Sequence, residues 1–312
     1  MPNLLVTGGA GFIGSHFVLR HVASHPADKI VVLDALTYAA DRSFLAPVES
    51  NITFVQGDIC DTALVEKLVT EQGIDTIVDF AAESHVDRSI ADPTSFLRTN
   101  VMGVQSLVDV CRKHPSVLYF HVSTDEVYGD LSDTQAPNTV EDPLKPSSPY
   151  AASKAAGDLI LLAGIRTYGI RARISRCTNN YGPHQASEKF MPTVIRHALA
   201  DQPIPIYAQG KNKRDWLYVT DHTDAIELLL EKGEDGHIYN ISADCERQNI
   251  DVARDILTLL AKPESLLSFV SDRPGHDWRY ALDSSQTHNL GWSPAVRFEQ
   301  GLRQTIEWYS KR

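Results

Sequence analysis

A tyrosine and a lysine four residues apart are suited to taking a proton from a substrate hydroxyl. Tyr150 and Lys154 follow the proline-rich loop Pro143–Pro149, and the sequence predicts that a helix begins there. Helix positions i and i+4 lie on one face. An ammonium group beside a phenol lowers a tyrosine pKa that is ordinarily about 10. We therefore predict that Tyr150 is a general base and that Lys154 assists it.

A second tyrosine–lysine pair has the same spacing but a different context. Tyr207 and Lys211 lie in a segment that contains Pro205 and Gly210. Both of these residues disfavour a helix, so this pair predicts a turn with a solvated lysine.

Two adjacent acids follow a hydroxyl residue at the end of the apolar run Val117–Val122. They are Asp125 and Glu126, directly after Thr124. Ligands gather at the carboxyl ends of parallel strands, so the pair lies where chemistry is expected. Adjacent acids are often ordinary loop residues, but they are also able to act as an acid and a base with separated pKa values. The residues alone leave both interpretations open.

A glycine-rich turn at the N-terminus predicts a dinucleotide site. Gly9, Gly11 and Gly14 fit the GxGxxG pattern between an apolar run and a helix start. Such glycines let the backbone approach a pyrophosphate, which the helix N-terminus stabilises. Asp34 lies 20 residues after Gly14, where a carboxylate binds an adenosine ribose and repels a 2′-phosphate. With Ala35 next to it, the pattern favours NAD over NADP. The alternative is that Asp34 is only a turn residue at a strand end, and the same choice applies to Asp58.

The elements that position these residues alternate between short apolar runs and amphipathic stretches. The predicted strands are Asn3–Thr7, Lys29–Leu33, Ile52–Gln56, Thr76–Phe80 and Val117–Val122. The predicted helices between them include Gly14–Ser24, Asp61–Gln72 and Pro93–Lys113, with Asp61 and Asp92 as N-caps. This alternation indicates an α/β fold: a Rossmann-type doubly wound parallel sheet with a smaller C-terminal substrate-binding lobe.

The second half of the chain is richer in Pro, Gly and Asn and predicts that smaller lobe. Its predicted elements are strands Gln202–Tyr207 and Leu266–Val270 and helices Asp221–Lys232, Ile250–Ala261 and Arg297–Lys311. We expect an NAD-binding domain over 1–175 and a nucleotide-sugar-binding lobe over 176–312, with a cleft between them. Returns to the main sheet are expected near 214–242, from Trp216–Val219 and His237–Ile241.

Bulk composition narrows the class of protein. The chain has 312 residues and a net charge of −11, which argues against nucleic acid as a partner. No apolar run approaches the roughly 18 residues of a membrane span. The start MPNLLVTGG lacks a signal-peptide pattern, and Cys60, Cys111, Cys177 and Cys245 form no CxxC pair. We therefore expect a cytoplasmic location without a membrane partner.

Beyond these patterns, the chain resembles the extended short-chain dehydrogenase/reductase superfamily through Thr7–Gly14, Tyr150 and Lys154. More specific blocks across nearly the whole chain resemble dTDP-glucose 4,6-dehydratases. These blocks are Ala81–Ile90, Ser123–Gly129, Ser175–Pro183, Arg214–Val219 and Asp272–Tyr280.

The resemblance implies a lyase with a tightly held NAD and a three-stage reaction. Tyr150, assisted by Lys154 and Thr124, would take the proton of the glucose C4 hydroxyl while the C4 hydride passes to NAD⁺. Glu126 would then remove the C5 proton, and Asp125 would protonate the departing C6 hydroxyl. Return of the hydride to C6 would give dTDP-4-keto-6-deoxyglucose.

Asp125 is the residue that best separates this reaction from related ones. Related 4-epimerases lack the Asp-Glu pair, and related UDP-glucuronate decarboxylases have serine in place of Asp125. The alternatives are a UDP-glucose 4,6-dehydratase, a nucleotide-sugar 4-epimerase, and an NAD-binding scaffold without chemistry. Thymine and uracil differ by one methyl group, which is worth only about 1–3 kcal/mol in an apolar pocket.

The resemblance also implies binding residues. For NAD they are Gly8, Gly11, Phe12, Ile13, Gly14, Asp34, Ala35, Leu36, Thr37, Asp58, Ile59, Phe80, Ala81, Ala82, Ser84, Thr99, Ser123, Tyr150, Lys154, Cys177 and Asn179. For the nucleotide sugar they are Ser84, His85, Thr124, Asn180, Glu188, Lys189, Phe190, Pro205, Tyr207, Arg214, Asn249, Arg273, His276 and Tyr280. Phe190 and Tyr207 are equally compatible with core packing. We predict no metal site among the 12 histidines.

The family pattern further implies a homodimer joined through the helix Pro93–Lys113 and the helix that starts at Tyr150. Two features depart from the family. The loop Asp130–Pro149 is short, and Ala35 replaces a lysine often found after the ribose-binding acid. These departures concern cofactor affinity and peripheral contacts rather than the reaction.

Overall fold

A seven-stranded parallel sheet forms the larger part of the computed structural model, which describes residues 2–311. The sheet has the order β10-β6-β5-β4-β1-β2-β3. Its strands are β1 (Asn3–Thr7), β2 (Lys29–Asp34), β3 (Ile52–Gln56), β4 (Thr76–Asp79), β5 (Leu118–Thr124), β6 (Arg171–Cys177) and β10 (Ile238–Ile241). The order reverses between β1 and β4, which is the topological switch point of a doubly wound fold. The predicted fold class is confirmed.

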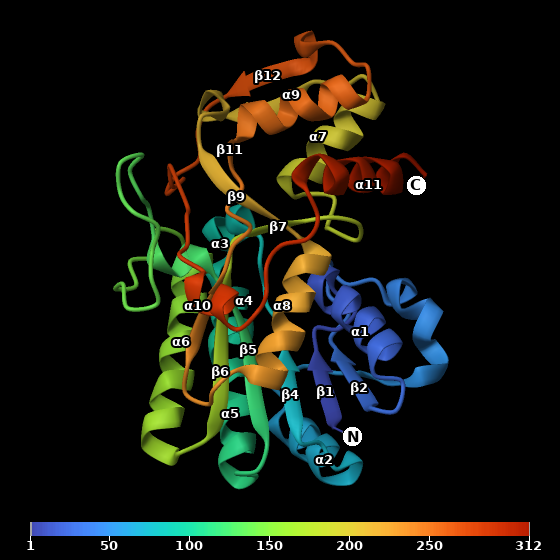
Figure 1. Cartoon of the computed structure of the whole chain (residues 1–312), viewed down its shortest axis with the longest axis vertical. Helices are drawn as coiled ribbons and strands as arrows, with labels where there is room; N and C mark the ends of the chain where they lie inside the picture. The colour runs from blue at the N-terminus through green and yellow to red at the C-terminus, as the bar shows by residue number, and fades with distance from the viewer. Residues whose placement is uncertain (1, 312) are drawn as a thin grey trace.

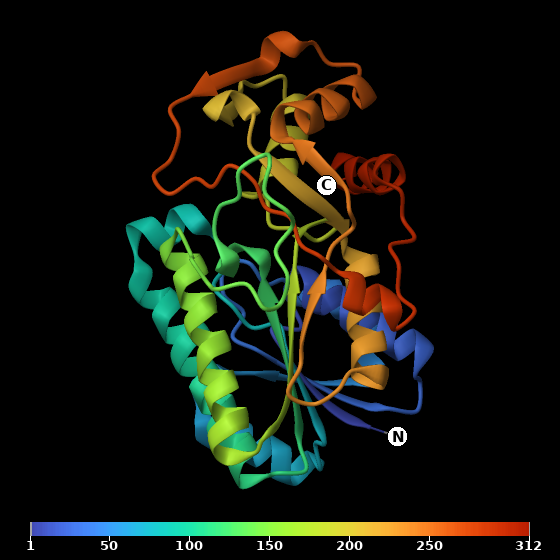
Figure 2. The ribbon, with the colours of Figure 1, turned by 60° about the vertical axis from the view of Figure 1, so that its left-hand side comes forward.

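Helices cover both faces of this sheet (Figures 1 and 2). One face carries α1 (Phe12–Ser24) and α8 (Val219–Lys232), and the other carries α2 (Thr62–Gln72), α5 (Val104–Lys113) and α6 (Pro149–Tyr168). Because side chains alternate along a strand, Leu4 and Val6 are buried under the first layer and Leu5 under the second. The strands are therefore buried on both faces, as their continuous apolar runs predicted.

The predicted helix Pro93–Lys113 is continuous but irregular. It contains α4 (Pro93–Leu97), a π-helical segment η2 (Arg98–Gly103) and then α5, and it follows the short helix α3 (Val86–Ala91). Asp92 caps α4 as predicted, accepting a hydrogen bond from Thr94 N at 3.0 Å, and Asp61 caps α2. The π-helical segment turns Asn100 inward, where its side chain donates to Ser153 Oγ of α6 at 2.8 Å. Apolar periodicity did not predict this widened turn.

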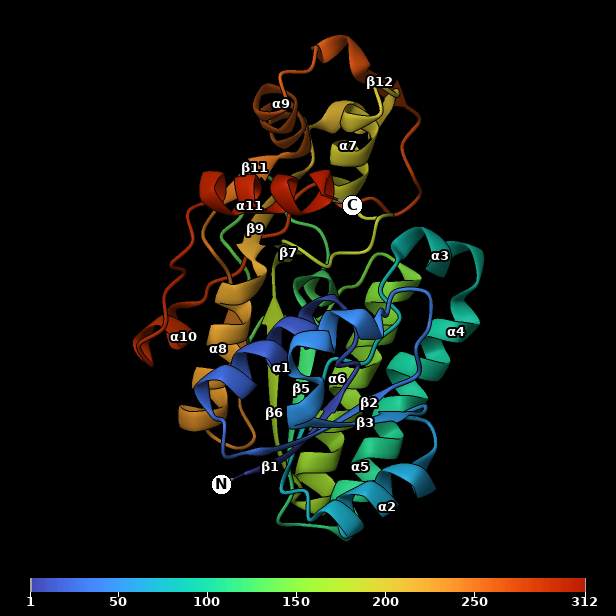
Figure 3. The same ribbon diagram turned by 90° about the vertical axis from the view of Figure 1, so that its right-hand side faces the viewer.

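The C-terminal lobe packs around its own core above the sheet (Figure 3). It contains the three-stranded sheet β11-β9-β7 and the pair β12-β8. Its elements are β7 (Asn179–Tyr181), α7 (Phe190–Leu199), β8 (Ile204–Tyr207), β9 (Lys213–Tyr218), β11 (Glu246–Gln248), α9 (Asn249–Leu259), β12 (Leu267–Val270) and α11 (Phe298–Ser310). Short helix α10 (Ser285–Asn289) and 3-10 turns η1 (Arg42–Asn51), η3 (Asp125–Tyr128), η4 (Ala208–Gly210) and η5 (Glu264–Leu266) complete the chain. No helix within residues 2–311 combines the length and apolarity needed to cross a membrane.

One of the two predicted returns to the main sheet is correct and the other is wrong. The segment His237–Ile241 supplies β10, which pairs in parallel with β6. Trp216 and Tyr218 instead lie in β9, which pairs with β7 and β11 in the small lobe. Their rings pack against Tyr181 in that lobe's core, and this burial fixes the strand there. After β9 the chain returns to the large sheet through α8, which packs on one face, and then β10, which pairs with β6.

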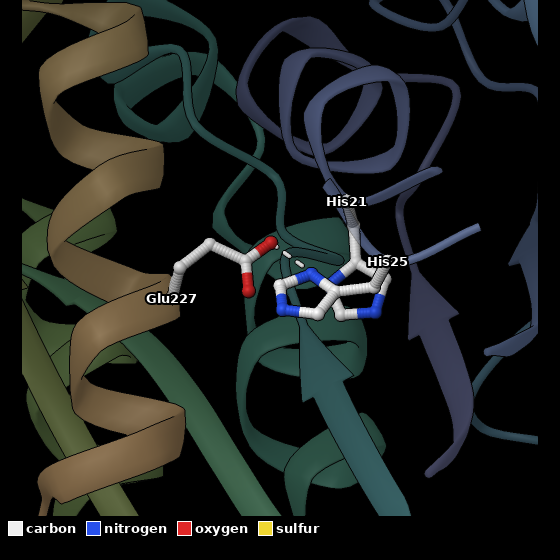
Figure 4. Close-up of side chains that lie close together, drawn as sticks. All are labelled: His21, His25 and Glu227. Atoms are coloured by element: carbon white, nitrogen blue, oxygen red, sulfur yellow. Dashed lines mark hydrogen bonds and ion pairs between the residues drawn. The ribbon is translucent and has the colours of Figure 1, made fainter. Parts of the chain in front are cut away.

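His21 links α1 to α8 through a buried ion pair (Figure 4). Its Nδ1 lies 2.8 Å from Glu227 Oε1, and its Nε2 lies 3.3 Å from Asp28 Oδ2. Burial lowers the pKa of His21, but Glu227 and Asp28 outweigh burial, and the net pKa is raised above 6.5. His25 stacks on His21 with an interplanar angle of 26°. Stacked rings direct their nitrogen lone pairs along nearly parallel planes rather than toward one point, which favours an ion-pair role over metal binding.

We expect the stability from this ion pair to depend on pH. Because the folded-state pKa of His21 is raised, the contribution is fully present below about pH 6.5 and is lost as pH rises through the folded pKa. Replacing His21 with glutamine should lower the free energy of unfolding by about 2 kcal/mol at about pH 6. Denaturant unfolding should show a smaller difference at alkaline pH. His25→Gln, with its exposed ring, is the matched control, and a pH-independent loss in His21→Gln would contradict the ion pair.

Candidate active site

A cavity opens at the carboxyl ends of the main-sheet strands. It is lined by the glycine-rich turn, the ends of β2, β4, β5 and β6, the start of α6, and the loop before α7. All residues predicted to contact the cofactor line this cavity except Leu36. Leu36 has a φ of +53° and packs toward the sheet core, so the structure places its side chain away from the cavity.

The glycine-rich turn has no room for side chains. Gly8 has a φ of +64°, and an added Cβ would lie 2.7 Å from Ala81 N. At Gly14 an added Cβ would lie 2.3 Å from Gly8 O. The turn thus passes close to the end of β4 and places the N-terminus of α1 at the cavity wall. This cradle fits the phosphates of a dinucleotide.

Two carboxylates lie where the adenosine half of a dinucleotide is expected. Asp34 lines the cavity, and its oxygens also accept hydrogen bonds from Ala10 N at 2.9 Å and Leu36 N at 2.8 Å. It therefore fixes the turn and faces the cavity, so the two interpretations of Asp34 are not exclusive. Asp58 accepts a hydrogen bond from Arg98 at 2.9 Å. Burial raises the pKa of Asp58, but hydrogen bonds from the Cys60 amide and from Arg98 outweigh burial. The net pKa is below 3.8, and the carboxylate stays ionised.

Tyr150 and Lys154 lie on the first turns of α6 and both face the cavity. Tyr150 is hydrogen-bonded to the Thr124 side chain. Burial, followed by the nearby carboxylate of Glu126, raises the pKa of Tyr150 well above 10. The folded chain alone therefore does not produce the lowered pKa that the sequence predicted for Tyr150. The YxxxK pattern contains no information about burial or about the neighbouring acids. Burial also lowers the pKa of Lys154.

Asp125 and Glu126 begin the 3-10 turn η3 directly after β5. Thr124 Oγ1 accepts a hydrogen bond from Glu126 N at 3.3 Å and donates to Asp125 Oδ1 at 3.1 Å. Asp125 is 2% exposed, and its Oδ2 is buried without a hydrogen-bond partner. Burial, followed by the charge of Glu126, raises the pKa of Asp125 well above 3.8.

Glu126 has a different electrostatic environment from Asp125. Burial raises its pKa, but the positive charges of Arg214, Arg273 and Lys189 oppose that rise. The pKa of Asp125 is thus raised by burial and by its acidic neighbour, while three cations oppose the rise at Glu126. This separation favours an acid–base pair over the alternative of two ordinary loop acids.

The predicted substrate residues divide into two groups. Ser84, Thr124, Asn180 and Lys189 line the cavity. The others lie outside its wall: His85, Glu188, Phe190, Pro205, Tyr207, Arg214, Asn249, Arg273, His276 and Tyr280.

Several members of this outer group still lie beside the acid–base pair. Tyr280 Oη lies 3.5 Å from Glu126 Oε2, and the guanidinium of Arg214 stacks over the Tyr280 ring at 4.3 Å. Phe190 instead stacks on Trp216 in the small-lobe core, as its alternative interpretation allowed. Tyr207 ends β8 and Lys211 follows the turn η4, so a turn rather than a helix joins the second tyrosine–lysine pair.

Some cavity residues were not predicted from the sequence. Gln185 and Ala186 come from the loop between β7 and α7, and Glu83 and Thr178 from strand-end segments. The turn signal Gly182-Pro183 marks the loop in the sequence, but nothing in the sequence shows that the loop folds back over the cavity.

We expect Gly8→Ala to abolish retention of a dinucleotide, because a Cβ would strain the backbone and push into the Ala81 amide. Gly169 is the matched control. It has a φ of +67° at the end of α6, but an added Cβ would meet nothing within 4 Å. Gly169→Ala should therefore cost about 1 kcal/mol of stability and keep the cofactor. Cofactor content of the purified proteins measures the difference, and equal content in both variants would contradict the cradle.

Comparisons with known proteins agree with this geometry. A family model described as GDP-mannose 4,6 dehydratase matches residues 5–305. A dTDP-glucose 4,6-dehydratase of Mycobacterium tuberculosis is 49% identical over 310 residues, covering 98% of this chain and 93% of that protein.

Solved structures show the same similarity. The crystal structure of dTDP-glucose 4,6-dehydratase from Streptomyces venezuelae, with NAD and TYD bound, has a TM-score of 0.96 and 45% identity, covering 99% of this chain and 97% of that one. UDP-glucose 4-epimerase of Thermus thermophilus, in complex with NAD, has a TM-score of 0.91 at 30% identity, covering 99% of both chains.

Proposed function

We propose that this chain, which belongs to the GDP-mannose 4,6-dehydratase family, binds NAD and dehydrates dTDP-glucose to dTDP-4-keto-6-deoxyglucose. The observation that carries the reaction is the buried Asp125, whose Oδ2 has no hydrogen-bond partner and whose pKa is raised, beside a Glu126 that faces three cations. An acid that protonates a leaving hydroxyl is required for dehydration and not for epimerisation at C4. The reaction makes the chain a hydro-lyase of deoxysugar biosynthesis.

The oxidation step uses Tyr150 as base. Its phenolate takes the proton of the C4 hydroxyl, and Thr124 hydrogen-bonds the phenol. We assign the assisting positive charge to Lys154, which lines the same cavity. The bound NAD accepts the C4 hydride and later returns it to C6. Burial of Tyr150 raises its pKa, so a positive charge beside the phenol is required to form the phenolate.

The elimination step uses the two acids. The C4 ketone acidifies the C5 proton, which Glu126 removes. Asp125 Oδ2, which has no hydrogen-bond partner in the folded chain, donates its proton to the C6 hydroxyl, and that group leaves as water. The proton that Glu126 holds returns to C5 as the hydride reaches C6, so atoms balance across the step.

Substrate binding divides between the two lobes. We assign NAD to residues 1–175 and the nucleotide sugar mainly to 176–312. Arg214 and Asn249 are assigned to the diphosphate, together with Asn180 of the cavity wall. A buried arginine provides local positive charge in a protein of net charge −11.

The substrate assignment is tested by offering dTDP-glucose and UDP-glucose separately to the NAD-loaded protein. We expect loss of one water and a 4-keto product from dTDP-glucose. A contact to the thymine methyl should favour dTDP-glucose over UDP-glucose by roughly 10–200-fold in kcat/KM. Inversion at C4 without loss of water would instead establish the 4-epimerase alternative, and a reversed preference would establish a UDP-glucose dehydratase.

We further propose a homodimer joined through α4, η2, α5 and α6. The exposed large apolar side chains on these elements include Leu97 at 52%, Met102 at 61% and Leu159 at 57%. Because α6 packs against both α4 and η2, these three side chains lie on neighbouring elements. A second copy of the chain is therefore able to cover all three at once.

The dimer predicts that Met102→Glu combined with Leu159→Glu gives monomers in sedimentation experiments, because two carboxylates would be buried in an apolar interface. The control is Leu199→Glu, an exposed leucine on α7 of the small lobe, which should leave the dimer intact. A monomeric unmodified protein would refute the dimer.

We also place the protein in the cytoplasm. All four cysteines carry free thiols, which is typical of proteins in a reducing compartment.

A further inference from the structure

A buried polar network holds Lys154 from below, and the reaction as described so far does not use it. Lys154 Nζ donates to Val122 O at 2.8 Å and to His121 Nε2 at 3.4 Å. Lys154 is 3% exposed and His121 is 0% exposed. His121 lies on β5, on the face of the sheet that α6 covers. The Lys154 side chain therefore packs against the His121 ring where it enters the cavity.

Behind His121 lies Asp79, on the neighbouring strand β4. His121 Nδ1 lies 3.0 Å from Asp79 Oδ2, which also accepts from Tyr119 Oη at 2.8 Å. Thr7 Oγ1 donates to the other oxygen of Asp79 at 2.6 Å. Thr7, Asp79 and His121 occupy matched positions on β1, β4 and β5, so the sheet register places their side chains in one row.

The donors and acceptors fix the direction of this row. A lysine ammonium only donates, so His121 Nε2 presents its lone pair to Lys154. The ring proton then lies on Nδ1, where Asp79 Oδ2 accepts it at 3.0 Å. Burial raises the pKa of Asp79, but His121 and the charge of Lys154 outweigh burial. The net pKa is below 3.8, so Asp79 is ionised. The chain of contacts runs from ammonium to imidazole to carboxylate.

A second buried acid is present, but it has its own cation. Asp158 Oδ1 lies 3.7 Å from His121 Nε2, while its Oδ2 accepts from Arg176 Nε at 2.9 Å. Arg176 is 2% exposed and compensates the charge of Asp158. Asp79 therefore remains the carboxylate whose charge balances Lys154 through His121.

We propose that His121 and Asp79 are positioning residues that keep the Lys154 ammonium charged and directed into the cavity beside Tyr150. The inference rests on the proposed function, because it assigns the Lys154 charge to the oxidation step. Without His121, the buried ammonium loses an acceptor and its link to Asp79, and burial favours the neutral amine. Tyr150 then needs a higher pH to become the phenolate.

The other charged groups around this pair are known. Lys154 faces Asp79, Asp158 and Cys177, and Tyr150 faces Glu126, Asp125 and Cys177. The acids and the thiol near Tyr150 all raise its pKa. We assign the opposing positive charge to Lys154, which lines the same cavity one helical turn beyond Tyr150.

The test is the pH dependence of kcat/KM for the NAD-loaded protein with dTDP-glucose. In His121→Phe and in Asp79→Asn we expect the acid limb to move to higher pH by roughly one unit or more. His121→Gln should return toward the unmodified profile, because its amide is able to accept from Lys154 and to donate to Asp79. Tyr119→Phe is the matched control. Tyr119 lies on β5, like His121, and its hydroxyl also donates to Asp79. Tyr119→Phe should therefore lower the melting temperature without moving the acid limb of the pH profile.

An unmoved acid limb in folded His121→Phe or Asp79→Asn, with only a lower melting temperature, would reduce the network to a structural role and overturn the proposal. If His121→Phe does not fold, Asp79→Asn and His121→Gln decide the question. Failure of the unmodified protein to form a 4-keto product would count against the proposed function instead, so the two failures are distinguishable.

Discussion

Replacing Asp125 with asparagine is expected to leave oxidation at C4 working and to stop the loss of water. Asparagine keeps the size of the side chain and a hydrogen bond with Thr124, but it has no acidic proton for the C6 hydroxyl. Dehydration should fall by about 10²–10⁴-fold, the usual contribution of a general acid. The reduced cofactor should accumulate on the protein, because the hydride has no acceptor at C6 until water leaves.

Rapid-mixing absorbance of the reduced nicotinamide and quantification of the 4-keto product measure the two halves separately. Asp133→Asn is the control. Asp133 is an exposed acid in the loop after η3, and it pairs with Lys213 of β9. Dehydration at the unmodified rate in Asp125→Asn would remove Asp125 from the mechanism.

Replacing Tyr150 with phenylalanine is expected to stop the reaction one step earlier. The ring would keep its edge contact with Phe96, whose centroid lies 6.3 Å away, so the cavity and cofactor should be retained. Without the phenolate there is no base for the C4 hydroxyl, and both reduced cofactor and product should fall by about 10³-fold or more.

The control for this variant is Tyr168→Phe, because Tyr168 lies at the exposed end of the same helix α6. Cofactor reduction that proceeds normally in Tyr150→Phe would contradict its role as base. Together, the two catalytic variants should stop at different stages, one before the hydride leaves C4 and one after.

The parts of this site that the sequence predicted depend on short-range patterns. The turn at Gly8–Gly14 joins a strand to a helix within a few residues, and Asp34 follows at a fixed separation, so local spacing was sufficient. The helix start at Tyr150 was likewise marked by prolines before it. Asp61 and Asp92 were predicted as caps because capping is a local interaction.

The parts that the sequence could not predict depend on how distant segments meet. His121 and Asp79 read as ordinary residues of buried strands until the register of β4 and β5 places them together. Arg214 and Arg273 affect Glu126 only because the small lobe folds over the end of β5. The raised pKa of Tyr150 has the same origin, since burial by tertiary packing cannot be read from a spacing of four residues.

Two further sequence predictions differ from the structure, one on strand placement and one on helix geometry. The segment Trp216–Val219 was predicted to return to the large sheet because its apolar run fits either sheet. Aromatic packing in the small lobe decided its place. The π-helical segment Arg98–Gly103 lies between two regular helical stretches, α4 and α5, and its buried residues are Asn100 and Gly103, so apolar spacing carries no signal for the widened turn.

The central claim is that oxidation at C4 is a temporary step that allows water to leave between C5 and C6. The most direct test is to run the reaction of dTDP-glucose with the NAD-loaded protein in deuterated water and to determine the product by NMR. The account predicts a 4-keto-6-deoxy product that carries solvent deuterium at C5, because Glu126 removes and returns that proton. A product inverted at C4 that retains its C6 hydroxyl and carries no deuterium at C5 would contradict the account.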